Sequence, residues 1–161
     1  MKIVNLCISN KNKDKFLFIK RNKHPFQGYF GMLGGKIEDG EDIYNAASRE
    51  LFEESGIISE GEYLGKCIEK IIENKNILFE SEIYFFHFII NEDINFYSSF
   101  EGDLRWISIK EFSNYRIIPS DPLMIDSFLN KKATATFSII EKINENYFQK
   151  KFKKLEKITK I

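Results

Sequence analysis

The spacing of apolar and polar positions predicts β-strands along most of the chain. Short segments in which apolar residues alternate or run together are separated by clusters of Asn, Asp, Gly and Lys. The predicted strands are residues 2–9, 15–21, 61–74, 77–90, 103–109, 134–143 and 147–155. A polar turn joins the first pair, and the last pair is expected to form a β-hairpin.

Two segments instead have the pattern of helices. Residues 43–54 carry an apolar face, with Asp42 placed to cap the first turn and Gly56 placed for a left-handed C-terminal residue. A second helix is expected at residues 119–130, with Ser120 or Asp121 as its cap.

Between the second and third predicted strands the chain is rich in turn-forming residues. Residues 24–31 contain a proline and two glycines and are expected to form a loop. The pair Gly34-Gly35 is expected to turn the chain sharply before the first helix.

Strands and helices interspersed in this order predict an α/β (α+β) fold, in which helices cover a mixed β-sheet from outside. The length of 161 residues suits one domain, residues 1–161, with a substantial core. The oligomeric state, monomer or homodimer, stays open.

Composition excludes several classes of function. A formal net charge of zero gives no general attraction to nucleic acid or anionic lipid, so no stable nucleic-acid or membrane partner is expected. The apolar run 83–90 is too short to span a bilayer. Cys7 and Cys67 lack metal-ligand spacing, and we expect buried free thiols in a reducing cytoplasm.

The chemistry of the chain is concentrated in the first predicted helix. At about 100° per residue, Glu50, Glu53 and Glu54 lie within one sector of about 100°. Carboxylates so close repel one another unless a cation lies among them. Their oxygens suit Mg²⁺, for which Mn²⁺ can substitute, and Mg²⁺ is commonly shared with substrate phosphates. The alternative is an acidic helix face that is simply solvated.

The segment around these glutamates resembles the signature of the Nudix hydrolases, G-x5-E-x7-R-E-U-x-E-E-x-G-U, where U is a bulky aliphatic residue. The matching positions are Gly35, Glu41, Arg49, Glu50, Leu51, Glu53, Glu54, Gly56 and Ile57. The resemblance implies a mixed Nudix-like α/β/α sandwich in which this segment forms a loop–helix–loop.

The same resemblance assigns roles within the signature. It implies that Glu50, Glu53 and Glu54 hold the metal and act in catalysis, with the Gly35 carbonyl as a further ligand. It implies a structural ion pair between Glu41 and Arg49.

The general base has two candidates. Glu53 is the first on geometry. Glu101 is the second, because MutT-type Nudix enzymes place a catalytic or metal-binding glutamate just before a strand that carries a tryptophan, here Trp106. The alternative for Glu101 is an ordinary polar turn.

The residues preceding the signature resemble those of MutT-type 8-oxo-dGTP diphosphatases, with Tyr29 and Phe30 in place of a tryptophan. The resemblance implies a nucleotide substrate: a nucleoside triphosphate, canonical or oxidised, cleaved to a monophosphate and pyrophosphate. Candidate substrate-binding residues are Lys36 for phosphate, Tyr29 and Ile118 for the base, and Asp121 as the remaining member of an acidic base-reading pair. Asp121 could equally be a helix cap, and Lys36 a solvated lysine.

Two other functions remain open. Another Nudix substrate, such as a dinucleoside polyphosphate, a nucleotide sugar or an RNA 5′ end, would keep the chemistry. A start so close to the first strand weighs against ADP-sugar enzymes, which usually dimerise through an added N-terminal region. A non-catalytic nucleotide or RNA sensor would use the lysine-rich tail 141–161, whose alternative role is that of a solvated edge strand.

Overall fold

The protein folds around one mixed β-sheet, seen in a computed structural model that describes residues 1–93 and 103–155. The strands are β1 (Lys2–Ser9), β2 (Lys15–Lys20), β3 (Phe30–Lys36), β4 (Glu62–Glu73), β5 (Asn76–Ile89), β6 (Leu104–Ser108), β7 (Ala135–Ile143) and β8 (Asn146–Lys154). Their order across the sheet is β6-β2-β3-β1-β5-β4-β7-β8. The predicted strands are thus all present.

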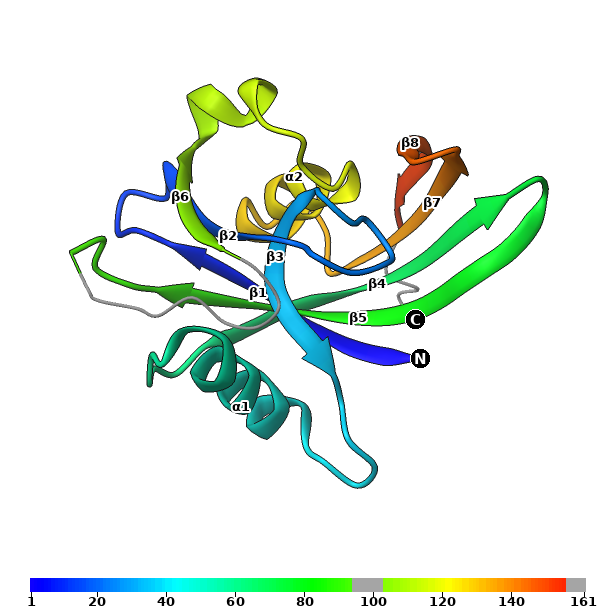
Figure 1. Ribbon diagram of the computed structural model, residues 1–161. Coiled ribbons are helices and arrows are strands. Elements are labelled where there is room, and N and C mark those ends of the chain that lie inside the picture. Colours follow the sequence, from blue (N-terminus) through cyan, green and yellow to red (C-terminus); the bar gives the residue numbers. More distant parts are fainter. Residues whose placement is uncertain (94–102, 156–161) are drawn as a thin grey trace.

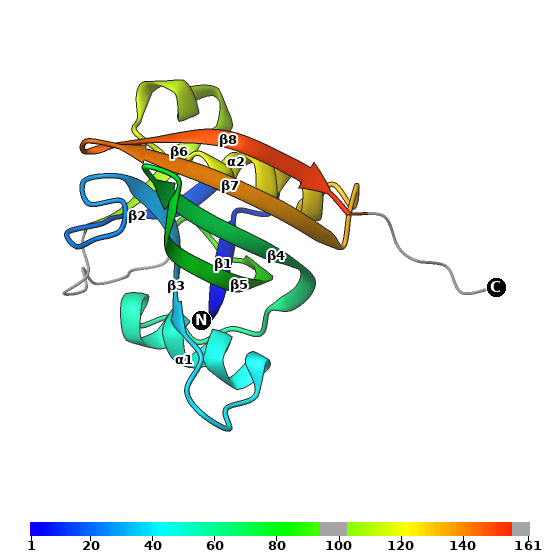
Figure 2. The same ribbon diagram turned by 90° about the vertical axis from the view of Figure 1, so that its right-hand side faces the viewer.

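Parallel pairings join the two halves of the sheet. β1 runs parallel to β5, and β4 runs parallel to β7, whereas the remaining neighbours are antiparallel. The terminal hairpin therefore continues the same sheet alongside β4, as Figure 2 shows.

Helices cover both faces of this sheet (Figure 1). Helix α1 (Ile43–Ser55) packs on one face, and α2 (Ser120–Met124), extended by a π-helical turn (Ile125–Leu129), packs on the other. A 3-10 helix (Ile109–Asn114) follows β6. The arrangement confirms the predicted α/β/α sandwich. Among the helices of the described residues, none is long and apolar enough to cross a membrane.

Successive side chains of a strand point to opposite faces of the sheet, so the core is divided between the two faces. In β1, Leu6 and Ile8 join the cluster under α1, whereas Cys7 lies in the cluster that contains Phe128 on the α2 side. Both cysteines are buried and free, as predicted.

Local sequence signals determine α1. The Asp42 carboxylate accepts hydrogen bonds from the backbone N–H groups of Tyr44 and Asn45, at 2.8 and 3.2 Å. Gly56 ends the helix with φ of 76°, in the left-handed region that glycine tolerates.

The predicted sharp turn at Gly34-Gly35 is wrong, because both glycines lie inside β3 and pair with Asn5 and Val4 of β1. Glycine usually weakens a strand, but here neighbouring atoms occupy the space a side chain would need. A Cβ on Gly34 would lie 2.0 Å from the Val4 carbonyl oxygen.

The predicted cap of α2 is also wrong. Pro119 occupies the cap position, and neither Ser120 nor Asp121 donates or accepts a capping bond there. Asp121 Oδ2 instead accepts a hydrogen bond from the backbone N–H of Met32 in β3, at 2.8 Å. Asp121 therefore bonds to a strand distant in sequence instead of capping its own helix.

Candidate active site

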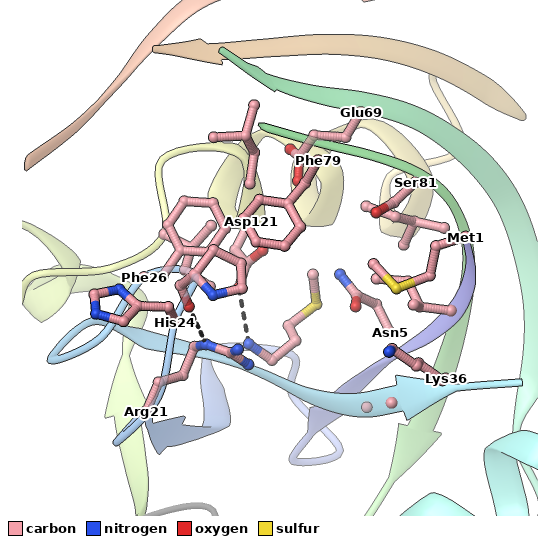
Figure 3. Close-up of a pocket in the computed structure, with 18 of the residues that line it drawn as sticks. Met1, Asn5, Arg21, His24, Phe26, Lys36, Glu69, Phe79, Ser81 and Asp121 are labelled. Atoms are coloured by element: carbon pink, nitrogen blue, oxygen red, sulfur yellow. Dashed lines mark hydrogen bonds between the residues drawn. The ribbon is translucent and has the colours of Figure 1, made fainter. Parts of the chain in front are cut away.

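A pocket of about 590 Å³ lies on the α2 side of the sheet. Its walls come from β1, β3, β4 and β5, from the loop before β3, and from the start of α2, as Figure 3 shows. The opposite ends of the pocket differ in chemistry. Lys36 and Asn5 lie toward one end, and Phe26, Phe79 and Asp121 lie toward the other.

The glycines of β3 and a glutamate of α1 form the first end. Gly34, Gly35 and Glu50 all line the pocket. A Cβ on Gly35 would lie 2.3–2.6 Å from the carboxylate atoms of Glu50, so this carboxylate occupies the space that the glycine leaves. The absence of a side chain at Gly35 is what brings Glu50 to the pocket from α1.

The other two glutamates of the predicted cluster differ in exposure. Glu54 is buried, and its Oε1 accepts a hydrogen bond from the backbone N–H of Gly34 at 2.7 Å. The Glu53 side chain is 55% exposed, and its Oε2 pairs with Arg49 at 3.2 Å. Glu50 lines the pocket itself, whereas Glu53 and Glu54 lie outside its lining.

These carboxylates fit a divalent cation that is shared with substrate. No three His, Cys, Asp or Glu side chains converge as a metal cluster in residues 1–93 and 103–155. Mg²⁺, however, is commonly held by one or two protein carboxylates and completed by phosphate oxygens and water. Glu50 and Glu54 are buried carboxylates next to the Gly34-Gly35 backbone, which is such a donor set.

Arg49 donates hydrogen bonds to several groups at this end of the site. Its guanidinium donates to both oxygens of Glu41, at 2.7 and 2.9 Å, and to the Lys36 carbonyl oxygen at 3.0 Å. It also donates to Glu50 Oε1 at 2.9 Å. The bonds from Arg49 lower the pKa of Glu41 to about 2. The arginine therefore fixes α1 to the end of β3, and it offsets the charge of the glutamates.

Two buried carboxyl groups line the apolar end. Asp121 comes from α2 and is 2% exposed, and Glu69 comes from β4 and is 7% exposed. Burial raises the pKa of Asp121 to about 8, and the nearby Glu69 adds to the rise. Burial also raises the pKa of Glu69. Phe26, Phe79 and Ile118 line the pocket around them.

The remaining predicted residues are distributed differently. Lys36 and Ile118 line the pocket, whereas Tyr29 lies outside its lining, in an aromatic cluster where its hydroxyl accepts a bond from the backbone N–H of Tyr147 at 2.8 Å. Glu101 lies outside the described residues.

Sequence reasoning missed Glu69, although a signal was present. Cys67, Glu69 and Ile71 alternate on one buried face of β4. A carboxylate in the buried register of a strand is rare and needs a reason.

Known proteins resemble this chain in sequence and fold. A family model described as the NUDIX domain matches residues 2–128. An ADP-ribose pyrophosphatase of Methanocaldococcus jannaschii is 47% identical over 45 residues, which span 28% of this chain and only 27% of that protein. The uncharacterized Nudix hydrolase YvcI of Bacillus subtilis is 30% identical over 115 residues, 70% of each chain.

A solved structure supports the same fold. The mutator MutT protein of Bacillus halodurans superimposes with a TM-score of 0.72 at 21% identity, covering 94% of this chain and 95% of that one. Identity this low establishes the likeness of the folds and leaves the substrate to be argued from the pocket.

Proposed function

Since this chain belongs to the Nudix family, we propose that it is a pyrophosphohydrolase that hydrolyses a nucleoside triphosphate, canonical or oxidised, to a nucleoside monophosphate and pyrophosphate, using Mg²⁺ or Mn²⁺. The pocket is the observation that carries this proposal. It joins a glycine-lined, carboxylate-bearing end to an end lined by Phe26, Phe79 and Ile118, and its volume of about 590 Å³ suits a nucleotide.

The first end provides the groups that handle phosphate. Glu50 and Glu54 would hold the divalent cation, which neutralises phosphate charge when bound. Lys36 also lines the pocket at this end and supplies positive charge for the remaining phosphate oxygens.

Hydrolysis needs a positioned base as well as charge neutralisation. The oxygen of water forms a bond to phosphorus, the bond from phosphorus to the bridging oxygen breaks, and the proton of water passes to a base. Glu53 is our candidate for this base. Its carboxylate is exposed on α1 beside the pocket-lining Glu50, and its bond to Arg49 orients it. The role of Glu101 stays a prediction.

A second candidate substrate is ADP-ribose. It is favoured by the 47% identity to the Methanocaldococcus jannaschii ADP-ribose pyrophosphatase. The matched 45 residues are a small part of that protein, so the pocket carries more weight here.

The two buried free thiols support action in a reducing compartment such as the cytoplasm.

A substrate panel tests the proposal. Canonical deoxynucleoside triphosphates, 8-oxo-dGTP and ADP-ribose are incubated with Mg²⁺, with Mn²⁺ and with a chelator, and the products are separated. We expect cation-dependent release of pyrophosphate from at least one triphosphate. Cleavage of ADP-ribose alone, to AMP and ribose 5-phosphate, would replace our leading substrate with the second.

A pair of matched variants tests whether Glu50 acts at the phosphate end of the pocket. Glu50→Gln removes the pocket carboxylate and should lower kcat/KM by at least about a hundredfold. Glu60→Gln alters an exposed glutamate beyond the helix and should leave kcat/KM unchanged.

A further inference from the structure

Glu69 is a buried carboxylate of the sheet that lines the pocket. It lies in the middle of β4, opposite Ser81 of β5 and Ser138 of β7, with its side chain on the pocket side. The Ser138 hydroxyl donates to Glu69 Oε1 at 2.9 Å. The structure gives Glu69 no ion pair within the described residues, so its charge has no cationic partner there.

Asp121 presents a second carboxyl group to the same end of the pocket. Its Oδ2 is held by the Met32 backbone, which leaves Oδ1 without a hydrogen bond from the described residues. Gly31 leaves room for the neighbouring Ile118, because a Cβ there would lie 2.5 Å from the Ile118 Cδ1. Figure 3 shows the two carboxyl groups close to the rings of Phe26 and Phe79.

We propose that Glu69 is a specificity-determining residue that, together with Asp121, binds the hydrogen-bonding edge of a guanine-type base, a purine with a 6-oxo and a 2-amino group. This inference rests on the proposed nucleotide pocket and names the base that it selects. The neighbouring phenylalanines supply the apolar contact for the ring.

The two carboxyl groups match this edge in number and in kind. A guanine edge carries donors at N1 and at the 2-amino group, next to an acceptor at O6. Asp121, which is protonated below about pH 8, can donate to O6. Glu69 accepts from N1–H and the amino group, and these donors stabilise its ionised form. Adenine has one donor and one acceptor on that edge, so a single protonated carboxyl group would suffice for it.

Binding of nucleoside monophosphates tests the inference separately from catalysis. Titration calorimetry without metal compares dGMP with dIMP, which lacks only the 2-amino group, and with dAMP. For the native protein we expect dGMP to bind at least about tenfold more tightly than either. Equal affinity for dGMP and dIMP would overturn the inference in the native protein, whatever the variants do.

Variants then assign the preference to Glu69. Glu69→Gln keeps the shape and removes the charge, and it should bring the affinities for dGMP and dIMP within about twofold. Glu80→Gln, in an exposed position of β5, should keep the native ratio. An unchanged ratio in a folded Glu69→Gln protein would overturn the role of Glu69. If Glu69→Gln does not fold, Asp121→Ala, which removes the group that would donate to O6, provides the second test and should weaken dGMP binding at least tenfold.

The two proposals fail in different ways. Selective dGMP binding without hydrolysis of any triphosphate would leave this inference standing and refute the proposed reaction. Hydrolysis of triphosphates without preference for guanine would do the reverse.

Discussion

Gly34 and Gly35 are adjacent in β3, yet a side chain at each would meet a different kind of atom. At Gly34 a Cβ would collide with the backbone of β1, whereas at Gly35 it would collide with the end of the Glu50 side chain. Backbone in the centre of a sheet cannot move, but a glutamate carboxylate can rotate away. Gly34 is therefore needed for the pairing of β3 with β1, whereas Gly35 leaves the space that the Glu50 carboxylate occupies.

This difference predicts opposite outcomes for two alanine variants. Gly35→Ala should keep the protein folded, because only a flexible side chain must move, and should lower kcat/KM by at least about a hundredfold as Glu50 is displaced. Gly34→Ala should lower the free energy of unfolding by about 3 kcal/mol or more. Urea unfolding and steady-state kinetics separate the two effects. A Gly35→Ala protein with native activity would show that the placement of Glu50 is irrelevant to catalysis.

The pair between Glu41 and Arg49 makes stability depend on pH in acid. The folded-state pKa of Glu41 is about 2, below its ordinary value of 4.5, so the pair stabilises the protein fully above about pH 4.5. The contribution is lost as the pH falls through the folded-state pKa. Because both side chains are partly exposed, we expect about 1 kcal/mol.

Comparison with Glu41→Gln isolates this contribution. The native protein should exceed the variant in free energy of unfolding by a constant amount above about pH 5, and the gap should close between about pH 4.5 and pH 2. Urea unfolding across this range measures the gap. A gap that stays constant down to pH 2 would mean that the pair does not form in solution.

At the scale of elements, α1 and β3 show why local patterns succeed in one case and fail in the other. The limits of α1 follow from Asp42 and Gly56, which act on backbone within a few residues of themselves. The glycines of β3 are strand residues only because Val4 and Glu50, distant in sequence, fill the space beside them. No local pattern contains that information.

The Asp42 cap of α1 should contribute measurably to stability. Asp42→Ala removes two hydrogen bonds to the first turn and should lower the free energy of unfolding by about 1 kcal/mol. Asp39→Ala, in the exposed turn before the helix, is the matched control and should change it little. Thermal or urea unfolding of both variants measures the difference, and equal losses would argue against the capping role.

At the scale of the whole molecule, the sheet brings together site residues that the sequence keeps apart. The signature between Gly35 and Ile57 predicted the carboxylate end and the pair of Arg49 with Glu41, because those residues are close in the chain. The other end depends on β4 lying beside β7 and on α2 reaching β3. Asp121 was therefore predicted with two possible roles, and Glu69 was missed.

The strand pairing of the sheet indicates how far the domain extends beyond the family match. The family match ends at residue 128, but β7 pairs with β4 over seven positions, from Lys66 with Ala135 to Ile72 with Glu141. We therefore propose that residues 1–161 form one domain. β8 lies at the edge of the sheet, where its lysines discourage pairing with another strand.

The stoichiometry of dGTP cleavage shows whether the protein releases pyrophosphate from a nucleoside triphosphate. The native protein is incubated with dGTP and Mg²⁺, and dGMP, dGDP, pyrophosphate and phosphate are quantified together over time. We expect one pyrophosphate for each dGMP, with cleavage abolished by a chelator and restored by added Mg²⁺. Release of phosphate with dGDP, or cleavage that continues in the chelator, would contradict it.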